Sequence, residues 1–428
     1  MTRECLQGGP DLVVADEAGA IFELPELCAA VECGRGPEPC PDSLWMPLPP
    51  GSDLFLLPGR TPIGLDRRTG DALPVPAMNG RLSAVAAFVA PAHTILRHPA
   101  WRRESDAPRL PLYAYCAVGW KDGGFCVPAV RIDRDIRQEL SGFDCDEIER
   151  RAEALLAQFP HNRLAAHLVN NCVRRYGCPA ARNFTLGRWE MPLPTAAACN
   201  SRCIGCISLQ PDGDYPVTQE RIDFVPTVEE IVELAVPHLL RAERPVASFG
   251  QGCEGEPLAN PRLLISAVRK IRKRTDRGTL NLNTNASDPD AVAALFDAGL
   301  DSIRVSINSA LPERYDAYYR PVNYRFEDVA RSLALAAEKG RWASINYLVF
   351  PGVTDTPREL EALSHLIQRT KLSMIQWRNL NIDPDDYRAL MAVCERPIGM
   401  ENLLAEVARR HPGVRFGYFN PCLSPQPA

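Results

Sequence analysis

The short segment "CNSRCIGC" contains three cysteines with the spacing C-x3-C-x2-C, namely Cys199, Cys203 and Cys206. Thiolates grouped this closely are ligands for soft metals, and iron–sulfur clusters and zinc sites are the common outcomes. Structural zinc sites use four protein ligands, whereas a catalytic metal site keeps one position open. The spacing therefore predicts a metal centre with either a remote fourth ligand or an open position.

Glycines and polar side chains follow three later segments that have strand character. These polar and glycine-containing stretches, at the ends of the strand-like segments, are Gly250–Leu258 ("GQGCEGEPL"), Asn283–Ser287 ("NTNAS") and Val305–Ser309 ("VSINS"). In a parallel barrel the carboxyl ends of the strands meet at one rim, and the loops that leave them carry function. A packed core does not need carboxylates and amides there, but a polar ligand does. We therefore expect a binding site at this rim.

The elements that position these loops alternate between strand and helix from Cys199 onward. A first strand at 188–198 is followed by six segments that are typical of buried parallel strands, at 245–249, 279–283, 302–307, 343–349, 372–377 and 414–418. Capping side chains precede prolines at Asn260-Pro261 and Asp288-Pro289, which marks helix starts. Six or seven such units predict a full or partial barrel.

The N-terminal third has a different composition. Short apolar runs between Pro- and Gly-rich turns predict β structure there, and helical spacing takes over at 144–175. We therefore expect a β-rich accessory domain at 1–140, a helical connector at 141–185, and a barrel domain with a C-terminal extension at 186–428.

Length and charge exclude several classes of protein. The chain has 428 residues, with 48 Lys plus Arg against 53 Asp plus Glu, so no basic field predicts nucleic acid or a membrane surface as a partner. Its start lacks the pattern of a signal peptide, and its longest apolar run is too short to span a bilayer. The expectation is a soluble cytoplasmic protein whose 15 cysteines are reduced thiols or metal ligands.

Residues 190–420 resemble the radical S-adenosylmethionine (SAM) enzymes, whose signature Cys199, Cys203 and Cys206 match. The resemblance implies an α/β fold, a partial (β/α) TIM-like barrel of the radical SAM type beside the β-rich accessory domain. It also implies a [4Fe–4S] cluster with three thiolate-held irons and a fourth iron that SAM chelates. The fourth iron, which has no cysteine ligand, is then the position at which SAM binds.

The stretch "EGEP" resembles the second motif of that family, Gly-Gly-Glu-Pro, which binds the methionyl ammonium. Gly255, Glu256 and Pro257 match, while Glu254 replaces the first glycine. The resemblance makes Glu256 the acceptor of the ammonium through a charge-assisted hydrogen bond. Gly255 would allow a close approach of the backbone.

Later motifs add weaker SAM-binding candidates. Asn285 aligns with the Thr-Asn-Gly segment of the family, and Ala286 replaces the glycine of that segment. Ser306 and Asn308 align with the family's fourth-strand segment, which contacts the ribose of SAM. Gly352 aligns with the segment that lies behind the adenine.

The same resemblance implies reductive cleavage of SAM to methionine and a 5′-deoxyadenosyl radical, which abstracts hydrogen from a substrate. A one-electron donor such as flavodoxin or ferredoxin is then a partner. The substrate is not identified, and no catalytic residue is assigned. Gln376 and Arg378 are substrate-side candidates, because strand alternation places both on one face near the rim.

Two alternatives stay open on the residues themselves. Cys199, Cys203 and Cys206 could bind zinc with Cys253 in a non-catalytic module, which the basic run Arg269–Arg277 would associate with RNA. That run is better explained as the end of a helix. Cys172 and Cys178 are expected to be core residues, the alternative being a second metal site with Cys145 or Cys253.

Overall fold

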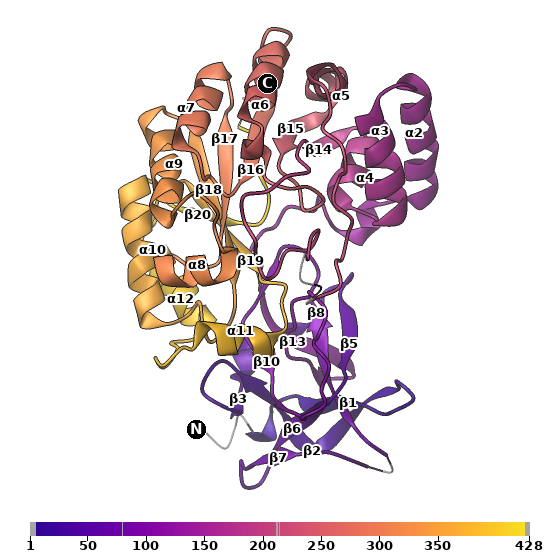
Figure 1. Ribbon diagram of the computed structural model, residues 1–428. Helices are drawn as coiled ribbons and strands as arrows, with labels where there is room; N and C mark the ends of the chain where they lie inside the picture. The colour runs from indigo at the N-terminus through magenta and orange to yellow at the C-terminus, as the bar shows by residue number, and fades with distance from the viewer. Residues whose placement is uncertain (1–5, 79, 211–212, 214, 424–428) are drawn as a thin grey trace. The chain divides into compact units, whose positions relative to one another are not determined.

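The structure of the protein is a computed structural model that describes residues 6–78, 80–210, 213 and 215–423. The chain forms two compact units, and Figure 1 follows its course from end to end. The first unit consists of Met1–Arg134, Leu348–Ser364 and Trp377–Pro412. The second consists of Asp135–Tyr347, His365–Gln376 and Gly413–Ala428.

This division differs from the three-part division proposed from sequence in one main respect. The segments 348–364 and 377–412, which sequence assigns to the barrel domain, belong to the unit that contains the N-terminal residues. The helical connector and the parallel strands share the other unit.

The first unit is built on an antiparallel sheet, as the turn-rich N-terminal sequence predicts. Its core packs Val13, Val85, Ile95 and Val127. Its thirteen strands are β1 (Asp11–Ala15), β2 (Ile21–Glu32), β3 (Glu38–Pro39), β4 (Trp45–Pro47), β5 (Asp53–Leu57), β6 (Arg60–Asp66), β7 (Ala72–Pro74), β8 (Ser83–Phe88), β9 (His93–Ile95), β10 (His98–Pro99), β11 (Trp101–Arg103), β12 (Gly119–Lys121) and β13 (Gly124–Arg131).

Two ion pairs join the N-terminal part of the first unit to its later segment 377–412. Arg60 and Asp383 lie 2.9 Å apart with fully buried side chains, and Arg97 donates to Glu401 at 2.7 Å. Breaking the fully buried Arg60–Asp383 pair would leave an uncompensated charge, so removing either partner should loosen the segment 377–412 from the sheet. The helices of the first unit are η1 (Asp42–Leu44), α11 (Pro384–Met391) and α12 (Met400–Arg410), and α10 (Pro357–Thr370) runs from this unit into the other.

The second unit contains a parallel sheet in chain order, which confirms the predicted partial barrel. Each predicted strand is present. The strands are β14 (Arg188–Leu193), β15 (Glu243–Phe249), β16 (Thr279–Thr284), β17 (Ser302–Ile307), β18 (Trp342–Val349), β19 (Met374–Asn379) and β20 (Arg415–Gly417). Every residue of β16 is buried, as expected for a strand covered on both faces.

Helices cover the outer face of this sheet, and Figure 1 shows α5, α6, α7 and α9 side by side along it. The side chains of Asn260 and Asp288 cap α6 and α7, as the sequence predicts. These helices are α5 (Val228–Arg241), α6 (Pro261–Arg272), α7 (Pro289–Ala298), α8 (Pro312–Tyr319) and α9 (Phe326–Glu338), with a short η4 (Pro257–Ala259) before α6.

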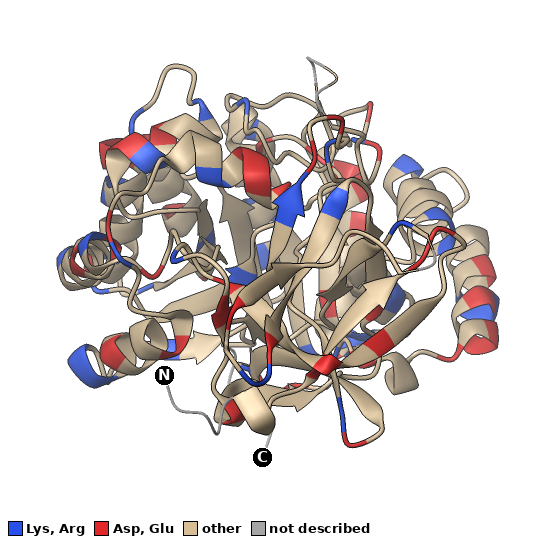
Figure 2. Ribbon diagram, turned by 90° about the horizontal axis from the view of Figure 1, so that it is seen from below, with Lys and Arg blue, Asp and Glu red and all other residues tan. Residues whose placement is uncertain are grey.

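The connector lies in the second unit and includes a segment of π-helix. Its elements are η2 (Leu140–Gly142), α2 (Cys145–Gln158), α3 (Arg163–His167), the π-helix η3 (Leu168–Arg175) and α4 (Pro179–Thr185). Acidic and basic residues are interspersed along these helices in Figure 2. No helix among the residues described has the length and apolarity needed to cross a membrane.

Candidate metal and cofactor site

The three cysteines lie on the loop that leaves β14. Cys199 is exposed, and Cys203 and Cys206 are partly buried. The loop is held by the C-terminal end of α8, because the N–H groups of Arg202 and Ile204 donate to the carbonyls of Tyr319 and Tyr318 at 3.0 and 3.1 Å. Three thiols on one anchored loop fit the donor set of an iron–sulfur cluster with one open iron.

A cation that the sequence did not single out stands beside these thiols. Arg221 donates to Cys206 Sγ at 3.5 Å, to Ser208 Oγ at 3.3 Å and to the carbonyl of Ala197 at 3.3 Å. Its guanidinium therefore faces the cysteine loop, where it would offset the negative charge of thiolates. No local signal marks it, since it lies 15 residues beyond Cys206.

The loop after β15 packs directly on the cysteine loop. The N–H groups of Gly255 and Glu256 donate to the carbonyls of Ala196 and Ala198 at 2.6 and 2.9 Å. A Cβ on residue 255 would lie 2.0 Å from the Ala198 carbonyl oxygen, so only glycine fits. The close approach expected of Gly255 is thus toward the cysteine loop, and Pro257 begins η4.

Glu256 is buried and its carboxylate accepts three hydrogen bonds. Asn285 donates its backbone N–H at 2.7 Å, Leu258 donates its N–H at 3.0 Å, and the Thr284 hydroxyl also donates. Burial raises the pKa of Glu256 to about 7, and the three donors lower it again in part. The carboxyl group of Glu256 therefore changes charge near neutral pH. When it is ionised, it can accept a further hydrogen bond from a cation through a lone pair that the three donors leave accessible.

Glu254, which departs from the family motif, has a separate set of partners. Its carboxylate accepts from the N–H groups of Thr195 and Ala196 at 2.6 and 2.9 Å, and from Gln251 N–H at 2.6 Å. Thr195 and Ala196 lead from β14 into the cysteine loop. Glu254 thus anchors the start of that loop.

Asn285 connects the two loops to a third. Its Nδ2 donates to Asn200 Oδ1 at 2.7 Å and to Ser201 Oγ at 3.0 Å. Ser201 in turn shares a 2.7 Å hydrogen bond with the Tyr324 hydroxyl. The structure therefore brings Asn285, Glu256 and the cysteine loop together.

The remaining candidates have other contacts in the structure. Ser306 Oγ accepts from Asn346 at 3.4 Å, and Asn308 donates to the carbonyl of Arg314 at 3.2 Å. Gly352 belongs to the first unit. Their roles toward SAM stay predictions.

The two substrate-side candidates lie in different units. Gln376 is fully buried in the second unit, where it accepts from Arg304 at 3.2 Å and donates to Asn420 at 3.0 Å. Asn420 also donates to Glu190 at 2.8 Å. Gln376 thus belongs to a polar network of the barrel strands, whereas Arg378 belongs to the first unit. Their predicted placement on a common face stays untested.

The basic run discussed for RNA ends α6 and its cations have local partners. Lys270 pairs with Glu229, and Arg272 pairs with Asp301. Cys253, the proposed fourth zinc ligand, is grouped with Cys172 and His167.

Comparison with known proteins finds a family match over a range that includes the cysteine loop. Residues 193–364 match the family model described as the Radical SAM superfamily. A GTP 3',8-cyclase of Heliobacterium modesticaldum is 28% identical over 225 residues, which cover 51% of this chain and 64% of that protein. The FeMo cofactor biosynthesis protein NifB of Klebsiella pneumoniae is 28% identical over 188 residues, which cover 39% of this chain and 38% of that protein.

This chain spans about half the length of the curated relatives it matches, from 38% to 64%. Among solved structures, the FeFe-hydrogenase maturase HydG from Carboxydothermus hydrogenoformans aligns with a TM-score of 0.36 at 13% identity, covering 62% of this chain and 68% of HydG.

Proposed function

We propose that this chain, whose residues 193–364 match the family model of the Radical SAM superfamily, is an enzyme that holds a [4Fe–4S] cluster on Cys199, Cys203 and Cys206 and cleaves SAM. The observation that carries this proposal is the backbone contact between two loops. Gly255 and Glu256 donate to the carbonyls of the segment that leads into Cys199. A buried carboxylate therefore stands beside a loop of three thiols, which is the pairing that SAM requires.

The chain's own residues have distinct parts in this proposal. The thiols of Cys199, Cys203 and Cys206 hold the cluster, and Arg221 places a positive charge beside it. Glu256, once ionised, accepts a hydrogen bond from the SAM ammonium. Asn285 keeps Glu256 and the cysteine loop in register through its backbone and side chain.

A cluster held by these thiols would supply the electron for reductive cleavage of SAM to methionine and a 5′-deoxyadenosyl radical, which would abstract a hydrogen atom from the substrate. The electron comes from a one-electron donor such as flavodoxin or ferredoxin. The relatives named above are GTP 3',8-cyclases and a cofactor biosynthesis protein, and their alignments cover 37% to 51% of this chain. We infer that the shared part binds the cofactors and that substrate choice lies in the rest.

The test is made on protein purified without oxygen. We expect about four irons and four sulfides per chain, a band near ~400 nm, and formation of 5′-deoxyadenosine when SAM and dithionite are added. Cys203→Ala should lose the band and the product. Cys394→Ala is the matched control, because Cys394 is an exposed thiol of the first unit. Zinc without acid-labile sulfide in the wild type, or a band that survives in Cys203→Ala, would overturn the proposal.

A further inference from the structure

Three metal-ligating side chains outside the proposed cluster site converge in the second unit. They are His167 at the end of α3, Cys172 in the π-helix η3 and Cys253 in the loop after β15. Their ligand atoms all lie within 4.8 Å of one another. We propose that these residues bind a zinc ion that ties η3 to the loop carrying Glu254 and Glu256.

The spacing of the three ligand atoms suits one ion. Zinc binds thiolate at about 2.3 Å and imidazole at about 2.0 Å in a tetrahedron, so its ligand atoms are roughly 3.3 to 3.8 Å apart. Ligand atoms within 4.8 Å of one another reach that arrangement with small side-chain movements. One imidazole and two thiolates leave a fourth position for water, as in zinc sites with three protein ligands.

The π-helical winding explains why two of the ligands share a side. In an α-helix, residues i and i+5 lie about 140° apart around the axis. In a π-helix, hydrogen bonds run from i to i+5, and the wider winding brings these residues closer to one side of the helix. The N–H of Tyr176 donates to the carbonyl of Asn171 at 3.1 Å in this pattern. His167 and Cys172 therefore project toward the same neighbour, and π-helical segments are common at functional sites.

Burial and charge favour a divalent ion over free thiols. Cys172 and Cys253 are 4% and 7% exposed. Nε2 of His167 is buried with no hydrogen-bond partner among the described residues. Zinc with two thiolates and a neutral imidazole is uncharged overall, so it can be buried at low cost, and its binding releases two protons to solvent.

The position of the ion gives it a role toward the neighbouring loops. Cys253 directly precedes Glu254, whose carboxylate holds Thr195 and Ala196. The carbonyl of Cys253 accepts from Ile222 N–H at 2.8 Å, next to Arg221. An ion at Cys253 therefore fixes a junction from which both Glu254 and Arg221 reach the cysteine loop.

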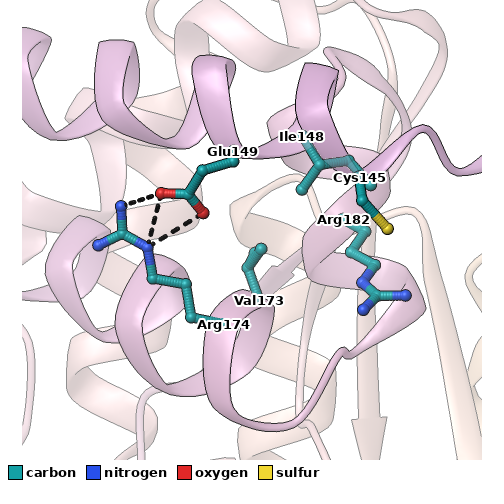
Figure 3. A pocket seen from close by; sticks show the side chains of 6 residues that line it. All are labelled: Cys145, Ile148, Glu149, Val173, Arg174 and Arg182. Carbon is teal, nitrogen blue, oxygen red and sulfur yellow. Dashed lines mark hydrogen bonds and ion pairs between the residues drawn. The ribbon is translucent and has the colours of Figure 1, made fainter.

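Cys145 supplies a control from the same connector. It is exposed at the start of α2 and lines a surface pocket of about 220 Å³. Figure 3 shows that pocket, with Glu149 and Arg174 joined at one side and Cys145 and Arg182 at the other. The residues that line it are Cys145, Ile148, Glu149, Val173, Arg174 and Arg182, and none of them belongs to the proposed zinc site.

The experiment measures metal content in the full chain, purified without oxygen after growth with zinc. Wild type should hold about one zinc per chain beside its iron. Cys172→Ser and His167→Ala should each lower bound zinc at least fivefold, and Cys145→Ser should keep it. The zinc should persist in a Cys199/Cys203/Cys206→Ala triple variant, because the cluster thiols do not hold it. Adding Co²⁺ to zinc-depleted protein should give thiolate-to-cobalt absorption that Cys172→Ser loses.

Equal zinc in wild type and Cys172→Ser would overturn the proposal, as would wild type without zinc. A Cys172–Cys253 disulfide found by mass spectrometry in the anaerobic protein would also overturn it. About eight irons and eight sulfides that fall to four each in Cys172→Ser would replace zinc with a second cluster. These readouts do not depend on SAM cleavage, so the proposed function can fail or hold independently.

Discussion

The backbone N–H of Thr195 donates a 2.6 Å hydrogen bond to the carboxylate of Glu254, which ties the end of β14 to the loop after β15. The family motif that this loop resembles has a glycine at position 254. Here the side chain accepts two further N–H groups, from Ala196 and Gln251. Two buried carboxylates, Glu254 and Glu256, thus lie two residues apart with separate partners, and their substitutions should have different consequences.

Glu256→Gln should weaken SAM binding without changing iron or sulfide content. The change removes a charge-assisted hydrogen bond to the ammonium, worth about 1.5–3 kcal/mol, and so roughly one to two orders of magnitude in SAM affinity. Titration of SAM into the reduced protein, followed by electron paramagnetic resonance, measures the affinity. Cleavage of SAM should recover in part at high SAM concentration. Identical affinities for wild type and variant would show that "EGEP" does not bind SAM.

The affinity of wild type for SAM should rise with pH between about 6 and 8. Burial raises the pKa of Glu256 to about 7, so its carboxyl is largely protonated below that pH and cannot accept from the ammonium. Below the pKa the affinity should fall up to about tenfold per pH unit. SAM dissociation constants measured across this range give the profile. Glu256→Gln should flatten it, and an unchanged slope in that variant would assign the titration to another group.

Glu254→Gln should lower the free energy of unfolding more than it lowers SAM affinity. The amide would turn a donor toward backbone N–H groups that need an acceptor, at a cost of about 1–3 kcal/mol. Chemical denaturation of the variant beside Glu26→Gln, an exposed glutamate of the first unit, measures the difference. A SAM affinity that falls as far as in Glu256→Gln, with unchanged stability, would contradict the anchoring role.

Gly255→Ala should impair cluster assembly. The new Cβ would lie 2.0 Å from the Ala198 carbonyl oxygen, so the backbone before Cys199 would have to move. Overpacking of this kind costs about 1–3 kcal/mol. Iron and sulfide analysis after reconstitution measures the effect. Gly413→Ala is the control, since a Cβ at that position would meet no atom within 4 Å beyond its own chain neighbours. Equal iron content in both variants would show that the close approach is dispensable.

Arg221→Gln should shift the reduction potential of the cluster to more negative values. The guanidinium donates to Cys206 Sγ at 3.5 Å, and a nearby positive charge favours the reduced, more negative cluster. A shift on the order of tens of millivolts is expected, because cluster potentials respond to charge and to hydrogen bonds on sulfur. Potentiometric titration gives the value. Arg202→Gln, at an exposed position of the same loop, should shift it less. Equal shifts would assign the effect to net charge alone.

Local patterns were sufficient for the elements of the barrel and for the cysteine loop. The β-α rhythm, the capping residues Asn260 and Asp288 and the spacing of the three cysteines are encoded within a few residues of one another. Such signals depend on backbone propensity and on side-chain periodicity, which a sequence displays directly. The predicted strands and helix starts are accordingly found in the structure.

Contacts between distant residues were decided by the tertiary structure. Cys172 was predicted to be a core residue, and no local pattern linked it to His167, yet the ligand atoms of both lie within 4.8 Å of that of Cys253. It also assigned 377–412 to the barrel domain, whereas buried pairs such as Arg60 with Asp383 hold that segment to the N-terminal sheet. The partners in these contacts are separated by tens to hundreds of residues. Which of them meet depends on how the elements pack, and no local pattern in the chain records it.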